Sequence, residues 1–121
     1  MPLKTLLIDD IRDIHVDQVC RTPEGGIMAL KYGGPWDELY LDHDMGYYPP
    51  IVEGEEFGET PQVRFQADGY GVCCFLEAHP EYKPKKIIIV SSNPSGAKMM
   101  AAALRNIYTG AVGDREFFDN D

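Results

Sequence analysis

Consecutive apolar residues recur along the chain in short runs, and polar or turn-forming residues separate them. The segments Lys4–Ile8, Leu39–Leu41 and Ile87–Val90 each contain such a run. Strands that are apolar without alternation are typical of a parallel sheet covered on both faces. The segment from His15 to Arg21 instead alternates apolar and polar residues, which predicts a second, half-exposed strand.

Polar and turn-forming residues mark the starts of helices between and after these strands. Thr22-Pro23-Glu24 combines a threonine cap, a proline at the first helical position and an acid in the first turn. Asp68-Gly69 opens a second helix, which Pro80 ends, and a third helix follows Ser91–Gly96. No helical pattern separates the first two strands, so we expect the first helix of an alternating fold to be missing.

Strands that alternate with helices predict an α/β fold with a parallel sheet between helical layers, a three-layer sandwich. Right-handed crossovers favour the strand order 2-1-3-4, numbered as the strands occur. Ala111–Val112 is expected as a short fifth strand at the edge. A chain of 121 residues fits one domain, spanning residues 1–121.

Two segments depart from the alternation of strands and helices. Residues 47–67 are rich in proline, glycine and glutamate and are predicted to form an inserted loop or hairpin, in which Ile51–Val52 pair with Val63–Phe65. Such an insert, directly after an acidic strand end, is either a lid over a site or a surface loop. Residues 113–121 are predicted to be a mobile tail, in which Phe117-Phe118 suggests docking onto the domain.

Charge and composition narrow the range of partners. The formal net charge of −9 argues against an extended nucleic-acid surface, because it repels a phosphate backbone. A small phosphorylated ligand remains compatible, since a bound divalent cation inverts the local charge. No apolar run is long enough to span a bilayer and no signal peptide is evident, so we expect a cytoplasmic protein without membrane contact. The three cysteines are expected to be free thiols.

Carboxylates gather at the ends of the first and third predicted strands. Asp9-Asp10 follows the first strand, and Asp42-His43-Asp44 follows the third. These strands are neighbours in the predicted order, and ligands of open α/β sheets bind just outside such carboxyl ends. Crowded carboxylates either raise their pKa values or hold a cation, and oxygen ligands suit Mg²⁺ or Mn²⁺. Asp9, Asp10 and Asp42 are therefore candidate metal ligands; the alternative is that they cap helices and turns.

Other polar residues near these strand ends offer proton transfer and phosphate binding. His43 is either a general acid or base near neutral pH, or a packed residue oriented by a carboxylate. The segment Ser91–Gly96 presents hydroxyls, an amide and backbone N–H groups at a helix start, where anions bind. Arg12 and Lys98 are either phosphate partners or ordinary surface charges. The candidate phosphate-binding residues are Arg12, Ser91, Ser92, Asn93, Gly96 and Lys98.

Four stretches in order resemble a known family. An acidic pair after the first strand, an Asp after the third and a Ser after the fourth resemble the receiver domain of response regulators. More closely, the chain resembles the cyclic-phosphate processing receiver-like family, marked by Asp-Asp-x-Arg, Leu-Asp-His-Asp-Leu-Gly, Asp-Gly and Ser-x-Asn-Pro-x-Gly. The corresponding stretches here are Asp9–Arg12, Leu41–Gly46, Asp68–Gly69 and Ser91–Gly96, and the resemblance runs from about residue 6 to 104.

The resemblance implies a receiver-like, or flavodoxin-like, fold and a metal-supported acidic pocket. Asp42 matches the receiver's phosphoacceptor, and Ser91 or Ser92 matches its switch hydroxyl. We expect Mg²⁺- or Mn²⁺-dependent hydrolysis of a cyclic or terminal phosphate on a nucleotide or RNA end. The expected catalytic residues are Asp42, His43 and Asp44, with Asp68 as a further site residue.

Departures from the receiver pattern leave two alternatives open. A receiver normally carries a lysine after its fifth strand, and here no lysine follows Lys98. Where the family commonly has an arginine after Asn-Pro-x-Gly, this chain has Ala97 and then Lys98. The first alternative is a non-catalytic module that binds a phosphorylated nucleotide signal. The second is a degenerate receiver that acts through protein–protein contacts.

Overall fold

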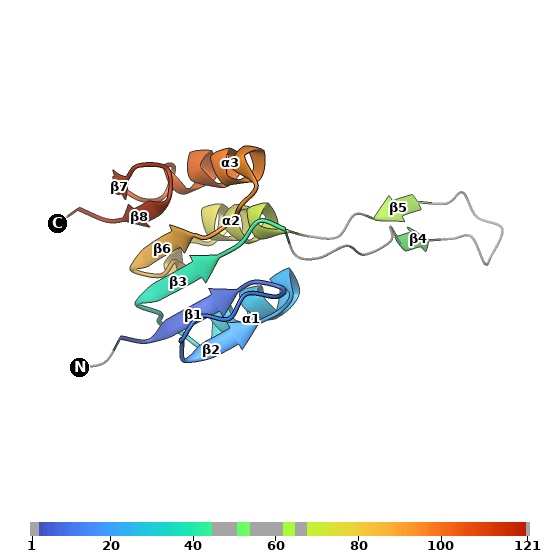
Figure 1. Ribbon diagram of the computed structural model, residues 1–121, viewed down its shortest axis with the longest axis horizontal. Coiled ribbons are helices and arrows are strands. Elements are labelled where there is room, and N and C mark those ends of the chain that lie inside the picture. The colour runs from blue at the N-terminus through green and yellow to red at the C-terminus, as the bar shows by residue number, and fades with distance from the viewer. Residues whose placement is uncertain (1–2, 45–50, 54–61, 65–67, 121) are drawn as a thin grey trace.

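The main sheet contains six strands in the order β2-β1-β3-β6-β8-β7 (Figure 1). We describe a computed structural model, in which residues 3–44, 51–53, 62–64 and 68–120 are placed. The first four strands are parallel, whereas β8 runs antiparallel to both of its neighbours. The six strands are β1 (Thr5–Ile8), β2 (Gln18–Cys20), β3 (Glu38–Leu41), β6 (Lys86–Ile89), β7 (Gly110–Val112) and β8 (Glu116–Phe118).

The predicted order of the first four strands is confirmed, as is the short edge strand near residue 111. The predicted absence of a first helix is also confirmed, because residues 9–17 connect β1 to β2 without one. The three described α-helices follow later and are α1 (Pro23–Tyr32), α2 (Gly69–Ala78) and α3 (Pro94–Leu104). A short 3₁₀ helix, η2 (Pro80–Tyr82), follows α2.

Each α-helix begins at a capping side chain, and α3 begins at Pro94, inside the Ser91–Gly96 segment that the sequence analysis placed before the helix. Thr22, Asp68 and Asn93 accept hydrogen bonds from the backbone N–H groups of Gly25, Gly71 and Gly96, respectively. The donor–acceptor distances are 3.0, 3.2 and 3.0 Å. A cap of this kind contributes about 1 kcal/mol by satisfying a backbone donor that has no partner within its helix.

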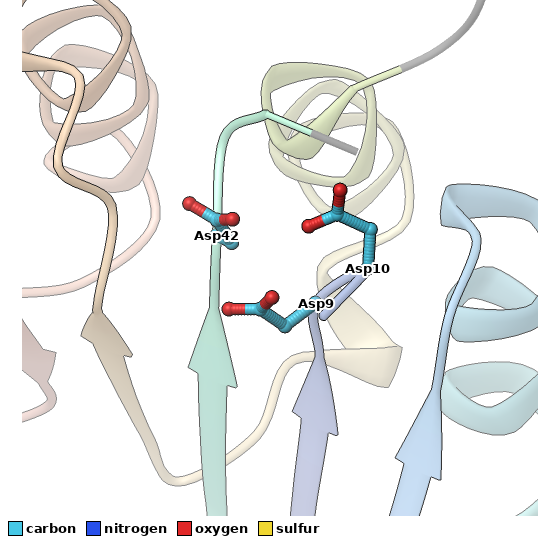
Figure 2. Close-up of side chains that lie close together, drawn as sticks. All are labelled: Asp9, Asp10 and Asp42. Atoms are coloured by element: carbon cyan, nitrogen blue, oxygen red, sulfur yellow. The ribbon is translucent and has the colours of Figure 1, made fainter. Parts of the chain in front are cut away.

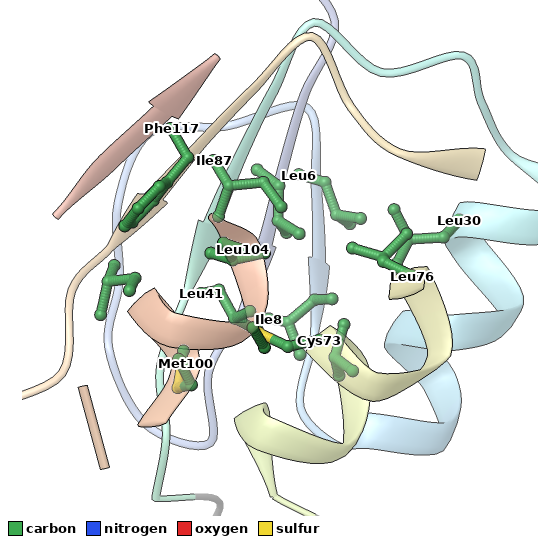
Figure 3. Close-up of a cluster of buried hydrophobic side chains, with 14 of the residues drawn as sticks. Leu6, Ile8, Leu30, Leu41, Cys73, Leu76, Ile87, Met100, Leu104 and Phe117 are labelled. Carbon is green, nitrogen blue, oxygen red and sulfur yellow. The ribbon is translucent and has the colours of Figure 1, made fainter. Parts of the chain in front are cut away.

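All three helices cover the same face of the sheet. The buried core joins apolar side chains of α1, α2 and α3 to alternate residues of the strands, among them Leu6, Ile8, Leu39, Leu41 and Ile87 (Figure 3). On the opposite face, Leu7 of β1 is fully buried, whereas Tyr40 and Ile88 are only half-buried. The described elements therefore form two layers, where three were expected.

Chain direction explains the missing third layer. The crossovers from β2 to β3 and from β3 to β6 advance the same way across the sheet, so right-handed connections place α1 and α2 on one face. Among the crossovers between parallel strands, only the one from β1 to β2 runs the other way, and it contains no helix. None of the described helices therefore covers the other face of the sheet.

The chain end is a strand of the sheet, in contrast to the mobile tail that the sequence predicted. Strand β8 inserts between β6 and β7, and Phe117 pairs with Ile87 and is fully buried. Lys83 holds Asp119 at 2.7 Å just beyond the strand. The prediction that the phenylalanines dock onto the domain is correct for Phe117.

The insert contains a two-stranded antiparallel sheet, formed by β4 (Ile51–Glu53) and β5 (Gln62–Arg64). Val52 pairs with Val63, as the sequence predicted. The residues that join this hairpin to the domain, 45–50 and 65–67, lie outside the described part, and so does the predicted role as a lid. Among the described helices, none is long and apolar enough to cross a membrane.

Candidate metal and phosphate site

Parallel pairing brings the acidic strand ends together. Strands β1 and β3 are in register at Ile8 and Leu41, and the next residues are Asp9 and Asp42. The N–H of Asp42 donates to the carbonyl of Ile8 at 3.0 Å, which continues the ladder by one step. One carboxylate oxygen from each of Asp9, Asp10 and Asp42 lies within 4.8 Å of the others (Figure 2). These are the three residues predicted as metal ligands.

Asp9 is fully buried and held by three donors. Its Oδ1 accepts the backbone N–H groups of Ile11 at 3.1 Å and Arg12 at 2.9 Å. Its Oδ2 accepts Nη1 of the Arg12 guanidinium at 2.7 Å. A buried carboxylate requires such compensation, because loss of hydration disfavours its charge. The Asp-Asp-x-Arg stretch therefore folds into a tight turn around the first of its acids.

The contacts around the carboxyl group of Asp42 compensate its negative charge only in part. Burial, and next the negative charge of Asp9, raise the pKa of Asp42 above its ordinary value. The N–H of His43, at 2.9 Å from Oδ1, and the charge of Arg12 offset this rise only in part. A divalent cation would relieve the same repulsion, which makes the cluster chemically suited to one.

A second cluster of polar side chains, centred on His43, directly follows Asp42 in the chain. Nδ1 of His43 lies 2.9 Å from Oδ1 of Asp44, and Nε2 lies 3.4 Å from Oδ2 of Asp68. The side-chain amide of Asn93 also donates to Asp44, at 3.2 Å. The hydrogen bonds from His43 and Asn93 lower the pKa of Asp44. Since both ring nitrogens of His43 face carboxylates, the arrangement favours the packed, oriented interpretation of this histidine.

Two glycines let helix starts approach the Asp42–His43 strand end. A Cβ atom at Gly69 would collide with the backbone carbonyl of Asp42, and one at Gly96 would collide with the His43 ring. The N–H of Gly69 donates to the His43 carbonyl at 2.9 Å. The glycines of the Asp-Gly and Asn-Pro-x-Gly stretches thus allow α2 and α3 to close around the site.

Some of the predicted phosphate residues contact the site, whereas others are exposed and do not. Ser91 is buried, and its hydroxyl accepts the N–H of Asn93 at 3.0 Å. The N–H of Gly96 is engaged by its own cap, Asn93, so it is not oriented toward an anion here. Ser92 and Lys98 are exposed, and the described contacts link neither to the carboxylates. Two of the predicted phosphate residues directly contact the acidic cluster: Arg12 pairs with Asp9, and the side chain of Ser91 forms a hydrogen bond with Asp42.

Two arginines that the sequence analysis did not single out brace the site. Arg21 donates from Nη1 to the carbonyl of Arg12 at 2.8 Å and to that of Asp9 at 3.3 Å, and from Nη2 to Asp13. Arg115 donates to the carbonyl of Ser91. Arg21 immediately follows β2, which pairs with β1, so parallel register could have placed it beside the Asp9 turn. Arg115 depends on the unpredicted strand β8.

A comparison with protein families assigns the chain. The model of the cyclic-phosphate processing receiver domain matches residues 4–106. The chain belongs to this family. The cyclic-phosphate processing receiver domain here therefore includes β1 to α3, with both polar groups of the site, whereas β7 and β8 lie beyond the matched segment. No curated protein and no solved structure is similar enough to the chain to count as a match.

The donor set fits a hard divalent cation. Carboxylate oxygens are the ligands that Mg²⁺ and Mn²⁺ prefer, and three of them converge here. In this structure the guanidinium of Arg12 supplies positive charge at the same place. Asp9, Asp10 and Asp42 are the residues that would hold a metal.

Proposed function

We propose that this receiver domain hydrolyses a cyclic or terminal phosphate on a nucleotide or RNA end, with Mg²⁺ or Mn²⁺ as its cofactor. The observation that carries the proposal is the convergence of Asp9, Asp10 and Asp42 within 4.8 Å, next to the Arg12 guanidinium. The family's association with cyclic-phosphate processing supports the substrate class. Hydrolysis adds water across one P–O ester bond. A cyclic phosphate then leaves a phosphomonoester and a hydroxyl group on the same molecule, whereas a terminal phosphate leaves a hydroxyl group and free inorganic phosphate.

The residues divide the work by their positions. Asp9, Asp10 and Asp42 would hold the cation, and its chemistry would be to polarise a phosphoryl oxygen and to activate water. Arg12 binds phosphate oxygens, since a guanidinium presents several donors in a fixed plane. Ser91 and Ser92 lie at the end of the neighbouring strand β6, where a hydroxyl can meet the phosphate.

The proton carrier is Asp44, oriented by His43. Asp44 is the more exposed of the two, with 62% of its side chain accessible against 15% for His43. Both ring nitrogens of His43 already face carboxylates, so the imidazole positions Asp44 and Asp68 relative to each other. A carboxylate that reaches solvent can exchange protons with water, as a general base must.

The test is a turnover assay on purified protein. A panel of 2′,3′-cyclic and 3′,5′-cyclic nucleotides, and an RNA with a 2′,3′-cyclic phosphate end, is incubated with Mn²⁺, Mg²⁺ or EDTA. We expect metal-dependent product formation by the wild type, loss of it in Asp42→Asn, and wild-type rates in Lys85→Gln, which removes a charge at the amino end of β6, away from the site at the carboxyl ends of the strands. The same reactions on a nucleotide and an RNA with a terminal phosphate complete the panel, and absence of turnover on every substrate with either metal rejects hydrolysis.

A second candidate is a binding module that leaves its phosphorylated ligand intact. Two observations favour it: both His43 ring nitrogens are engaged, and the lowered pKa of Asp44 makes that carboxylate a weak general base at neutral pH. Calorimetric titration of the same nucleotides, followed by chromatography of the recovered ligand, distinguishes the two. Metal-dependent binding with full recovery of uncleaved nucleotide selects the module.

A further inference from the structure

The proposed metal ligand Asp9 already holds a cation, the guanidinium of Arg12. Nη1 of Arg12 lies 2.7 Å from Oδ2 of Asp9, whose side chain is 1% exposed. The other oxygen, Oδ1, accepts the N–H groups of Ile11 and Arg12. Both oxygens that a metal could use on Asp9 are therefore engaged. Of these partners, the guanidinium can leave without unfolding the turn.

We propose that Arg12 is an internal counter-ion that changes partners when the site is loaded. Arg12 neutralises Asp9 while no metal is bound, and it transfers to the phosphate of the ligand when a divalent cation takes its place. The inference rests on the proposed function, because it presumes that the carboxylate cluster binds a divalent cation.

The anchoring of Arg12 permits this exchange. Its backbone is held on both sides, by its own N–H on Asp9 and by Arg21, which donates to its carbonyl at 2.8 Å. Its side chain is 36% exposed, so the guanidinium can swing without leaving a hole in the core. Only the side chain needs to move, and the turn that shapes the site stays in place.

Charge provides the driving force for the exchange. A guanidinium beside a divalent cation is repelled by it, and the repulsion is strong next to buried carboxylates, where the effective dielectric is low. A phosphate bound at the metal offers the displaced guanidinium a new bidentate acceptor. Metal and phosphate should therefore each strengthen the binding of the other, and this coupling is reciprocal.

The experiment measures Mn²⁺ binding by electron paramagnetic resonance, at micromolar Mn²⁺, with and without inorganic phosphate. Wild type, Arg12→Gln and Lys85→Gln are compared. Lys85 directly precedes β6 and pairs with Asp37 at 3.3 Å. Lys85→Gln therefore removes one positive charge, as Arg12→Gln does, but at the amino end of the strand, away from the site. We expect phosphate to raise the Mn²⁺ affinity of wild type and Lys85→Gln about tenfold.

Arg12→Gln should differ in both conditions. Without phosphate it should bind Mn²⁺ roughly five- to tenfold more tightly than wild type, because no guanidinium has to be displaced, and phosphate should then add less than twofold. Unchanged or weaker Mn²⁺ binding by Arg12→Gln overturns the inference. Tighter binding that phosphate still enhances as in wild type also overturns it, because Arg12 then only repels the metal.

A second variant guards against misfolding of the first. Arg12→Lys keeps the charge but offers a single ammonium in place of the guanidinium fork, so it should retain the weak metal affinity and lose most of the enhancement by phosphate. Enhancement equal to wild type counts against the exchange. If neither the wild type nor any variant binds Mn²⁺, the proposed function is rejected as well. If the wild type binds Mn²⁺ but the Arg12 variants bind it with the same affinity and the same phosphate effect, only this inference is rejected.

Discussion

At the scale of single residues, the site is a compromise between stability and charge. Asp9 and Asp42 are buried side by side, and the structure compensates Asp9 far better than Asp42. The raised pKa of Asp42 records this difference. The ionised form of Asp42 is unfavourable for the fold, and this residue lies at a strand end beside two other carboxylates. Such an arrangement is expected at a binding site and would not be needed for a purely structural role.

Asp42→Asn should therefore stabilise the metal-free protein. The amide oxygen can still accept the N–H of His43, while the repulsion from Asp9 is removed. We expect a gain of about 1 kcal/mol in the free energy of unfolding at pH 7, measured by urea denaturation in EDTA.

The pH dependence of this gain follows from the direction of the pKa shift. Because the folded-state pKa of Asp42 is raised above its ordinary value of 3.8, the wild type loses stability as the pH rises from about 4 through the folded pKa. The advantage of Asp42→Asn should be complete at neutral pH and vanish below pH 4. Asp44→Asn is the matched control and should change stability in the opposite direction. The pKa of Asp44 is lowered, so its ionised form stabilises the fold at neutral pH, and this stabilisation is lost in acid. A destabilised Asp42→Asn protein at pH 7 would contradict this account.

At the scale of elements, the helix starts matter as much as the strand ends. Asp68 and Asn93 cap α2 and α3 and also belong to the polar group around His43. Gly69 and Gly96 allow the two helices to approach that closely. The motif stretches are thus largely packing devices that set the position of His43 and Asp44.

Gly96→Ala tests this interpretation. The added methyl group would force the His43 ring to move, because it collides with the ring and not with the backbone. We expect at least a tenfold loss of metal-dependent turnover, with the helical circular dichroism retained. Gly25→Ala, in the first turn of α1 and away from the site, is the control and should keep wild-type turnover. Wild-type turnover in Gly96→Ala would show that the placement of His43 does not matter.

The sequence could predict what depends on local pattern and parallel pairing. The apolar runs, the helix starts at Thr22 and Asp68, and the meeting of Asp9 with Asp42 all follow from such signals. It could not predict the use of the Gly96 N–H by Asn93, because an anion seat and a capped helix start have the same sequence.

At the scale of the whole molecule, the chain end completes the sheet. Strand β8 lies outside the segment that the family model matches, yet Phe117 fills the core next to Ile87. Its charged neighbours made this segment resemble a mobile tail in the sequence. The pairing of β8 with β6 is a tertiary contact between residues far apart in the chain, and no local pattern encodes it.

Truncation of the Phe117 side chain should therefore be costly. Phe117→Ala removes a fully buried ring, and we expect a loss of about 3–5 kcal/mol in the free energy of unfolding, measured by urea denaturation. Phe118→Ala, on the half-buried side of the same strand, should lose clearly less. Equal, small losses in both variants would mean that the tail does not pack as described.

A direct Mn²⁺ titration tests the proposed divalent metal site of Asp9, Asp10 and Asp42. The bound ion is counted by electron paramagnetic resonance in wild type, Asp42→Asn and Lys85→Gln. We expect one saturable Mn²⁺ site per chain in wild type and Lys85→Gln, and loss of that site in Asp42→Asn. Absence of saturable binding in wild type, or an undiminished site in Asp42→Asn, would contradict the proposal.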